Sequence, residues 1–184
     1  YYDWSLGVGD SSHRGSSQNA FNGQSLAHRF GTPELLALLE ATGGEALLTA
    51  NYGTGSAEQA SAWAKYLRSQ GARARLWEVG NEIYLSGPGT NGPNGKAIYH
   101  RPENYAKDFA RYRSALRSVF PDALVGAIAH LDTAAFPLAP AENRDWTLRM
   151  IKALEGPIDF LAVHNAYAPV LLDDSASFAD ERSR

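Results

Sequence analysis

The sequence predicts an α/β fold in which helices cover a parallel β-sheet. Four short apolar runs, each about the length of a buried strand, alternate with segments that carry helical periodicity or helix-capping residues. This alternation requires parallel strands joined by helical crossovers. With 184 residues, of which 44% are hydrophobic and 20% charged, the chain is long enough for one domain with a substantial core.

Residues 1–31 are expected to form loops or irregular structure, because they hold many Gly, Ser, Asn and His residues without sustained periodicity. The first helix follows them. Thr32 is its expected cap, Pro33 suits the first helical position, and Glu34 places an acid in the first turn. The helix should stop at Gly43-Gly44.

The first buried strand is expected at residues 46–51, where a short apolar run leads into the turn Tyr52-Gly53-Thr54-Gly55. Ser56 and Gln59 then have the spacing of a capping box, and Gly71 closes the helix that the box begins. This segment therefore predicts one strand–helix unit.

The same pattern continues to the end of the apolar segments. Further strands are expected at 76–82, 124–129 and 159–163, with helices beginning at Pro102 and spanning 145–154. A long loop rich in Gly, Pro and Asn separates the second strand from Pro102. The aromatic residues expected in the core by their helical spacing are Trp63, Tyr105, Phe109 and Tyr112.

Periodicity alone does not distinguish an open doubly wound sheet from a closed barrel, the two common solutions for such alternation. No strand is followed by a phosphate-binding GxGxxG motif, whereas polar residues follow the ends of successive strands, as barrel active sites require. We therefore expect a (β/α)8 TIM barrel, represented here by about four central βα units.

Composition and charge exclude several classes of protein. The net charge of −3 comes from interspersed charges, so neither nucleic acid nor a membrane surface is expected as a partner. No apolar run is long enough to span a bilayer. Five scattered histidines and the absence of HExxH, Walker, GxSxG and EF-hand patterns predict no metal and no cofactor. The absence of cysteine leaves cytosolic and secreted locations both open.

The most informative segment is Trp77-Glu78-Val79-Gly80-Asn81-Glu82, which places an amide and a carboxylate at the end of a buried strand. Burying a carboxylate costs several kcal/mol unless it is paired or hydrogen-bonded. For an arbitrary pair, Asn81 capping a turn and Glu82 beginning a solvated loop would be the usual interpretation. Strand alternation places Glu78, Gly80 and Glu82 on one face, and a bulge at the rim would let Asn81 and Glu82 both reach a ligand.

This run closely resembles the fourth-strand motif of clan A glycoside hydrolases. Together with Arg29-Phe30-Gly31-Thr32 and the turn at 51–55, in the same order and at similar spacing, it makes the chain up to about residue 167 resemble family 51 α-L-arabinofuranosidases. The resemblance implies that Glu82 is the general acid/base and that Asn81 hydrogen-bonds the sugar. The four strands would then be the third to sixth of the barrel.

Asn51, His164 and Tyr167 are further candidates for substrate binding. The resemblance places Asn51 near the sugar, although an Asn-x-Gly-x-Gly turn is more often plain turn chemistry. His164 follows the fourth strand and is either a substrate contact or a rim histidine satisfied by backbone. Related families end the sixth strand with His-x-Tyr, the tyrosine facing the nucleophile, and Tyr167 fits that place only if a bulge absorbs one extra residue. His130, after the third strand, is expected to be structural or solvated.

The aromatic residues near the start, Tyr1, Tyr2 and Trp4, are expected either to stack against a sugar or to pack the rim of the barrel. A retaining glycosidase needs two carboxyl groups roughly 5 to 5.5 Å apart. Only Glu82 is a credible candidate, since the acidic residues of the polar tail after residue 170 lack strand character. In clan A the nucleophile ends the seventh strand, which predicts that residues 1–184 are a fragment of a single (β/α)8 catalytic domain, with the N-terminal strands and the seventh strand outside it.

The function expected from this resemblance is retaining hydrolysis that removes α-L-arabinofuranosyl groups from plant polysaccharides or oligosaccharides. A β-xylosidase or β-glucanase of the same clan, or a non-catalytic carbohydrate-binding barrel, remains an alternative. The expected partner is a carbohydrate, and a homo-oligomer of the full-length enzyme stays open. The fragment alone, which lacks the nucleophile, is expected to be inactive. Its two unpaired sheet edges predict that it is not a well-behaved monomer.

Overall fold

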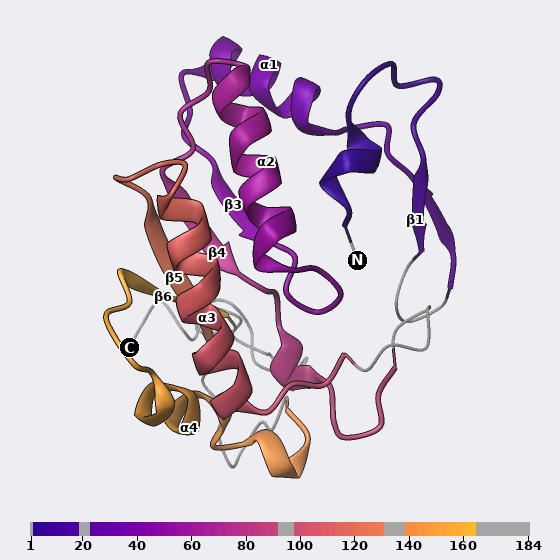
Figure 1. Ribbon diagram of the computed structural model, residues 1–184. Helices are drawn as coiled ribbons and strands as arrows, with labels where there is room; N and C mark the ends of the chain where they lie inside the picture. Colours follow the sequence, from indigo (N-terminus) through magenta and orange to yellow (C-terminus); the bar gives the residue numbers. More distant parts are fainter. Residues whose placement is uncertain (1, 19–22, 92–97, 131–138, 165–184) are drawn as a thin grey trace, which may run out of the picture.

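The computed structural model describes residues 2–18, 23–91, 98–130 and 139–164, and at its centre is a four-stranded parallel sheet (Figure 1). The strands are β3 (Leu47–Ala50), β4 (Leu76–Val79), β5 (Leu124–His130) and β6 (Phe160–His164). They lie side by side in sequence order, β3-β4-β5-β6, and every neighbouring pair is parallel. The expected strands are therefore confirmed, and their order does not reverse as it would in a doubly wound sheet.

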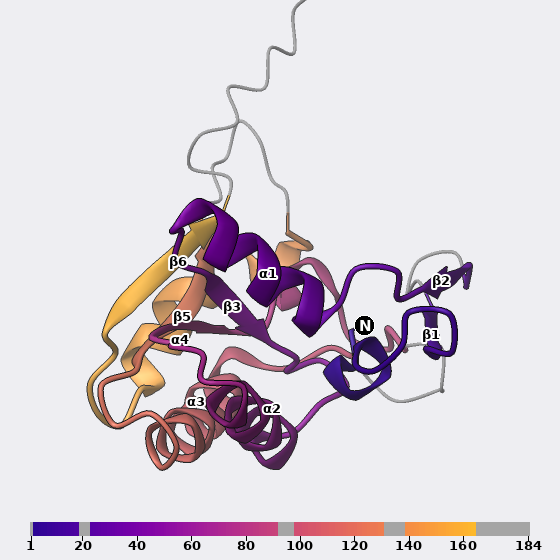
Figure 2. The ribbon, with the colours of Figure 1, turned by 90° about the horizontal axis from the view of Figure 1, so that it is seen from above.

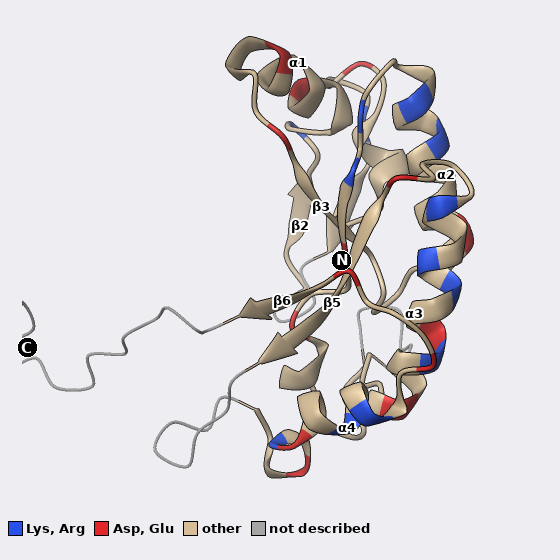
Figure 3. Ribbon diagram, turned by 90° about the vertical axis from the view of Figure 1, so that its left-hand side faces the viewer, with Lys and Arg blue, Asp and Glu red and all other residues tan. Residues whose placement is uncertain are grey.

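Helices connect the successive strands on one face of the sheet. They are α2 (Ala57–Ser69), α3 (Pro102–Arg117) and α4 (Trp146–Ala153). Helix α3 packs between α2 and α4, and Figure 2 shows these helices below the strands. Their charged residues face away from the sheet (Figure 3), as expected for helices that cover a barrel from outside. In the ranges that the structure describes, no helix is long and apolar enough to cross a bilayer.

The capping residues explain where the helices begin. Ser56 Oγ accepts the amide N–H of Gln59 at 3.2 Å, and Gln59 Oε1 accepts that of Ser56 at 3.1 Å, which confirms the capping box of α2. Helix α1 (Thr32–Thr42) differs from expectation, because its N-cap is Gly31 instead of Thr32. The hydroxyl of Thr32 accepts the indole N–H of Trp63 instead, at 3.1 Å.

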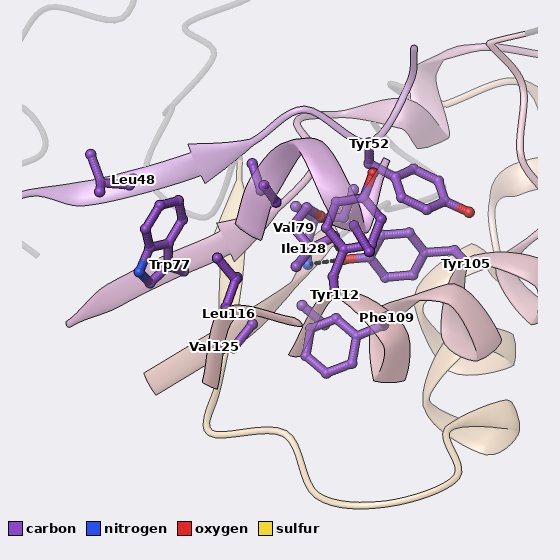
Figure 4. Packing of buried hydrophobic residues seen from close by; sticks show 14 of the residues in the cluster. Leu48, Tyr52, Trp77, Val79, Tyr105, Phe109, Tyr112, Leu116, Val125 and Ile128 are labelled. Carbon is purple, nitrogen blue, oxygen red and sulfur yellow. Dashed lines mark hydrogen bonds between the residues drawn. The ribbon is translucent and has the colours of Figure 1, made fainter. Parts of the chain in front are cut away.

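The hydrophobic core lies between the sheet and the helices (Figure 4). Trp77, Val79 and Val125 point to this side and are fully buried. The rings of Trp63 on α2 and Trp77 on β4 meet edge to face, 5.3 Å apart and at 90°. The four aromatic residues expected in the core from their spacing are all buried: Trp63, Tyr105, Phe109 and Tyr112.

The N-terminal segment is more ordered than the sequence suggested. It forms a short 3-10 helix, η1 (Trp4–Gly7), and an antiparallel pair of strands, β1 (Ser16–Gln18) and β2 (Ser25–Ala27). The expectation of irregular structure was wrong here because these strands are three residues long and mostly exposed, so they carry no periodic apolar signal. Trp4 packs against Tyr66.

Two further short 3-10 helices, η2 (Ile83–Leu85) and η3 (Ala141–Asn143), follow strands β4 and β5. Within the described ranges, β3 and β6 are the outer strands of the sheet. Apolar side chains on both are exposed, among them Leu47, Leu161 and Val163. Both outer strands of the described sheet thus carry exposed apolar side chains.

Candidate active site

The carboxyl ends of β4 and β6 bring together one histidine and two glutamates. His164 Nδ1 lies 3.3 Å from Glu82 Oε1, and His164 Nε2 lies 3.6 Å from Glu78 Oε2. Glu78 and Glu82 come from β4 and the turn after it, whereas His164 ends β6, with β5 between them in the sheet. Convergence of side chains at this edge is what a barrel active site requires.

The backbone after β4 turns sharply to present Glu82. Gly80 has φ +84°, and Glu82 has φ +48° in the left-handed region. Glu82 is the one non-glycine residue with positive φ among the described residues. A non-glycine residue in this conformation costs about 1–2 kcal/mol, so the surrounding structure must impose it. Strain of this kind is common at functional sites and directs attention to Glu82.

Two tyrosines of α3 fix the strand ends that precede the site. The Tyr105 hydroxyl donates to the carbonyl of Val79 at 2.7 Å and accepts the amide N–H of Ile128 at 3.1 Å (Figure 4). The Tyr112 hydroxyl donates to the carbonyl of Asn51 at 2.9 Å. Burial raises the pKa of both phenols above the ordinary value, so both stay protonated and able to donate.

Glu78 is the site residue that sequence reasoning missed as a functional candidate. Its side chain is 9% exposed, and its Oε1 accepts the Thr49 hydroxyl hydrogen bond from β3 at 2.6 Å. The signal was present in the alternation of β4, since Trp77 and Val79 face the helices and Glu78 must face the opposite side. A glutamate placed there costs several kcal/mol unless it finds partners, and Thr49 and His164 supply them.

A pocket of about 550 Å³ opens beside Glu82. Asn81 and Glu82 line it from the turn after β4, and Asn51 lines it from the turn after β3. Tyr2 from the N-terminal segment and Trp63 from α2 complete the lining. This volume is in the range of small-molecule sites. A neighbouring pocket of about 630 Å³ shares Tyr2, Asn51 and Trp63 with it and extends toward η1 and β1.

Asn51 lines the pocket, but its side-chain amide is already hydrogen-bonded to other parts of the protein. Its Oδ1 accepts the amide N–H of Thr54 at 3.2 Å, and its Nδ2 donates to Thr54 Oγ1 at 3.0 Å and to the carbonyl of Tyr2 at 3.2 Å. Asn81, by contrast, is exposed in the pocket. Asn81 is therefore the amide better placed to meet a ligand.

The remaining candidates have other surroundings. His130 is buried and structural: its amide N–H donates to Thr147 Oγ1, and its Nε2 lies 3.1 Å from the carbonyl of Asn143. Tyr2 packs against His28 and Trp63, as expected of rim packing. Tyr1 and Tyr167 lie outside the described residues.

The surroundings of Tyr84, which lies close to Glu82 and Glu78, favour the neutral form of its phenol hydroxyl. Burial, and then the charges of Glu82 and Glu78, raise the pKa of Tyr84, which follows Glu82 in η2. In the part of the chain that the structure describes, no three His, Asp or Glu side chains gather closely enough to hold a metal ion.

No known protein-family profile matches the chain. Among curated proteins it is similar to an intracellular exo-α-L-arabinofuranosidase of Bacteroides ovatus, with 29% identity over 134 residues, which cover 64% of this chain and 24% of that protein. The chain therefore spans about a quarter of the length of this relative. The similarity agrees with the resemblance read from the sequence motifs.

Solved structures with the same fold include two family 51 α-L-arabinofuranosidases. The enzyme of Thermotoga petrophila aligns with a TM-score of 0.66 and 22% identity over 89% of this chain and 33% of that one. The enzyme of Xanthomonas axonopodis aligns with a TM-score of 0.65 and 24% identity over 88% of this chain and 33% of that one. The fold is thus that of part of a (β/α)8 barrel, as the sequence predicted.

Proposed function

We propose that this chain is the central part of the catalytic barrel of a retaining glycoside hydrolase that removes α-L-arabinofuranosyl groups, with Glu82 as its general acid/base. The observation that carries the proposal is the position of Glu82. It ends the turn after β4 in a strained conformation, lines a pocket of about 550 Å³ and contacts His164 across the sheet. The similarity to an arabinofuranosidase of Bacteroides ovatus supports the choice of sugar.

In the proposed mechanism, Glu82 acts twice. Its carboxylic acid protonates the glycosidic oxygen as the bond to the sugar breaks, and its carboxylate then deprotonates the water that releases the sugar. Asn81, exposed in the same pocket, would orient the sugar hydroxyls beside the scissile bond. Two carboxyl groups suffice for this chemistry, so the reaction needs no cofactor.

The nucleophilic carboxylate would come from a strand outside these residues. Glu78 is poorly suited to the role, because it is buried, accepts the Thr49 hydroxyl hydrogen bond and does not line the pocket of Glu82. The proposal therefore includes the expectation that residues 1–184 are one part of a larger catalytic domain. In that domain the exposed apolar side chains of β3 and β6 would be covered.

The test is to assay the complete protein on 4-nitrophenyl α-L-arabinofuranoside, β-D-xyloside and β-D-glucoside, following the anomer first released by proton NMR. The expected result is turnover of the arabinofuranoside with retained configuration. Preference for the xyloside or glucoside would reassign the sugar within the same clan. Binding of arabino-oligosaccharide without turnover of any substrate would instead make the barrel a carbohydrate-binding protein.

A further inference from the structure

We propose that Glu78 is a positioning residue for acid catalysis: it turns the protonated Nε2 of His164 toward itself, leaving Nδ1 to accept a hydrogen bond from the carboxylic acid of Glu82. This inference rests on the proposed function, because it gives Glu82 the role of acid. It adds a buried carboxylate and a defined histidine tautomer to the site.

The geometry carries the first step. The imidazole of His164 lies between two carboxyl groups, with Nδ1 3.3 Å from Glu82 Oε1 and Nε2 3.6 Å from Glu78 Oε2. A neutral imidazole has one N–H and one lone pair, so it donates to one of these groups and accepts from the other. The choice of tautomer therefore decides what Glu82 meets.

Burial determines which group receives the N–H. The Glu78 side chain is 9% exposed and that of Glu82 is 33% exposed. A buried carboxylate depends on protein donors, whereas Glu82 can also be solvated from the pocket. Glu78 Oε1 already accepts the hydroxyl of Thr49, and Oε2 faces Nε2. The present separation of 3.6 Å is long for a hydrogen bond and would need to shorten by about 0.4 Å.

The consequence for Glu82 follows from this arrangement. With the proton on Nε2, the Nδ1 lone pair accepts the O–H of protonated Glu82 and fixes the orientation of the carboxyl group that must donate to the leaving oxygen. Glu82 carries a single proton, so when substrate binds, the O–H breaks its hydrogen bond to Nδ1 and turns to the glycosidic oxygen, and no other proton needs to move. The arrangement resembles the way a buried aspartate orients the histidine of a serine protease.

A spectroscopic experiment tests the tautomer independently of activity. The ring ¹⁵N resonances of His164 are measured in the complete protein from mildly acidic to neutral pH, so that the state with protonated Glu82 is sampled, and are assigned by their loss in His164→Gln. We expect a protonated Nε2 and an unprotonated Nδ1, and loss of this preference in Glu78→Gln. A protonated Nδ1 in the wild type, a doubly protonated ring, or the same tautomer in Glu78→Gln would overturn the proposal.

A kinetic experiment tests the role in catalysis. Glu78→Gln should lower kcat on natural arabino-oligosaccharide about tenfold or more, a part of the 10²- to 10⁴-fold contribution of general acid catalysis, with little change in KM. The release of dinitrophenolate in the first turnover of a dinitrophenyl arabinofuranoside, whose leaving group needs no proton, should be nearly unchanged. An equal loss on both substrates would make Glu78 structural and overturn the proposal.

The matched control is Asp159→Asn. Asp159 is a carboxylate of similar exposure at the opposite end of β6, where it accepts from Arg113, Arg117 and the amide N–H of Val125. Its loss should lower stability and leave the dependence on the leaving group unchanged. If the wild-type protein hydrolyses no glycoside, the proposed function fails, and the NMR result still decides whether Glu78 sets the tautomer of His164.

Discussion

The hydroxyl of Tyr105 donates to the carbonyl of Val79 at 2.7 Å, three residues before Glu82. The same hydroxyl accepts the amide N–H of Ile128 at 3.1 Å. The pairing of β4 with β5 ends at Val79. From there on, the phenol of Tyr105 on helix α3 makes the hydrogen bonds that the strand ladder no longer makes. Helix α3 thereby holds the point from which the chain turns to present the candidate acid.

The first prediction is that Tyr105→Phe lowers the free energy of unfolding by about 1–3 kcal/mol, because it leaves a buried carbonyl and a buried amide N–H without partners. Urea unfolding measures this change. The matched control is Tyr66→Phe on α2, a phenol that stacks on Trp4. The control should change the free energy by less than about 0.5 kcal/mol, and equal losses in both variants would show that the Tyr105 hydroxyl has no special part.

Gly126 on β5 gives a second prediction, since a Cβ there would lie 2.2 Å from the ring of Phe160 on β6. Gly126→Ala should therefore destabilise the protein by about 1–3 kcal/mol through overpacking. Adding Phe160→Ala removes the obstructing ring. In a double-mutant cycle the two losses should be clearly less than additive, whereas additive losses would show that the ring does not constrain Gly126.

The third prediction concerns pH. The hydrogen bond from Arg14, at 2.7 Å, and then the amide N–H of Gly31 hold the pKa of Glu34 at about 2, below its ordinary 4.5. The unfolded chain takes up this proton near pH 4.5 and the folded protein near pH 2, so the stabilisation is present above pH 4.5 and is lost as pH falls from 4.5 toward 2.

Urea midpoints between pH 2 and pH 6 test this expectation. Glu34→Gln should flatten the acidic fall in the midpoint, because the titrating carboxyl group is gone. Glu40→Gln, on the exposed side of the same helix, is the matched control and should leave the fall as it is in the wild type. A Glu34→Gln profile parallel to that of the wild type would contradict the role of the Arg14–Glu34 pair.

The backbone strain at Glu82 gives a fourth prediction. Glu82→Gly should be more stable than Glu82→Ala by about 1 kcal/mol, because only glycine adopts φ +48° without cost. Thermal or urea unfolding of the two variants measures the difference. At the neighbouring Asn81, whose φ is not positive, the order should reverse. A more stable Glu82→Ala would mean that the turn relaxes in solution.

Most of the fold could be predicted from the sequence, because local signals and the fold agree there. The capping box of Ser56 and Gln59 predicts where α2 begins. The spacing from Tyr105 to Tyr112 predicts which face of α3 is apolar and packs against the strands. The cap at Gly31 was missed since the hydroxyl of Thr32 is used by Trp63, a partner 31 residues away that no local pattern reveals.

The candidate site was predictable only in part. Glu82 and His164 could be named because each follows an apolar run, and the structure brings them within 3.3 Å. The contacts of Glu78 depend on the register of the strands. In the sheet it pairs with Thr49 on β3 and Gly126 on β5, and its side chain reaches His164 on β6, two strands away. Such cross-strand relations arise from the sheet as a whole, so a single strand's sequence does not contain them.

The most direct test of the central claim is Glu82→Ala in the complete protein with azide. Loss of the acid should abolish nearly all turnover of natural polysaccharide, about 10²- to 10⁴-fold, while a dinitrophenyl arabinofuranoside still gives a burst as the covalent intermediate accumulates. Azide, which needs no deprotonation, should restore turnover and yield a glycosyl azide of retained configuration. Equal loss on both substrates, with no effect of azide, would contradict the assignment of Glu82 as the acid/base.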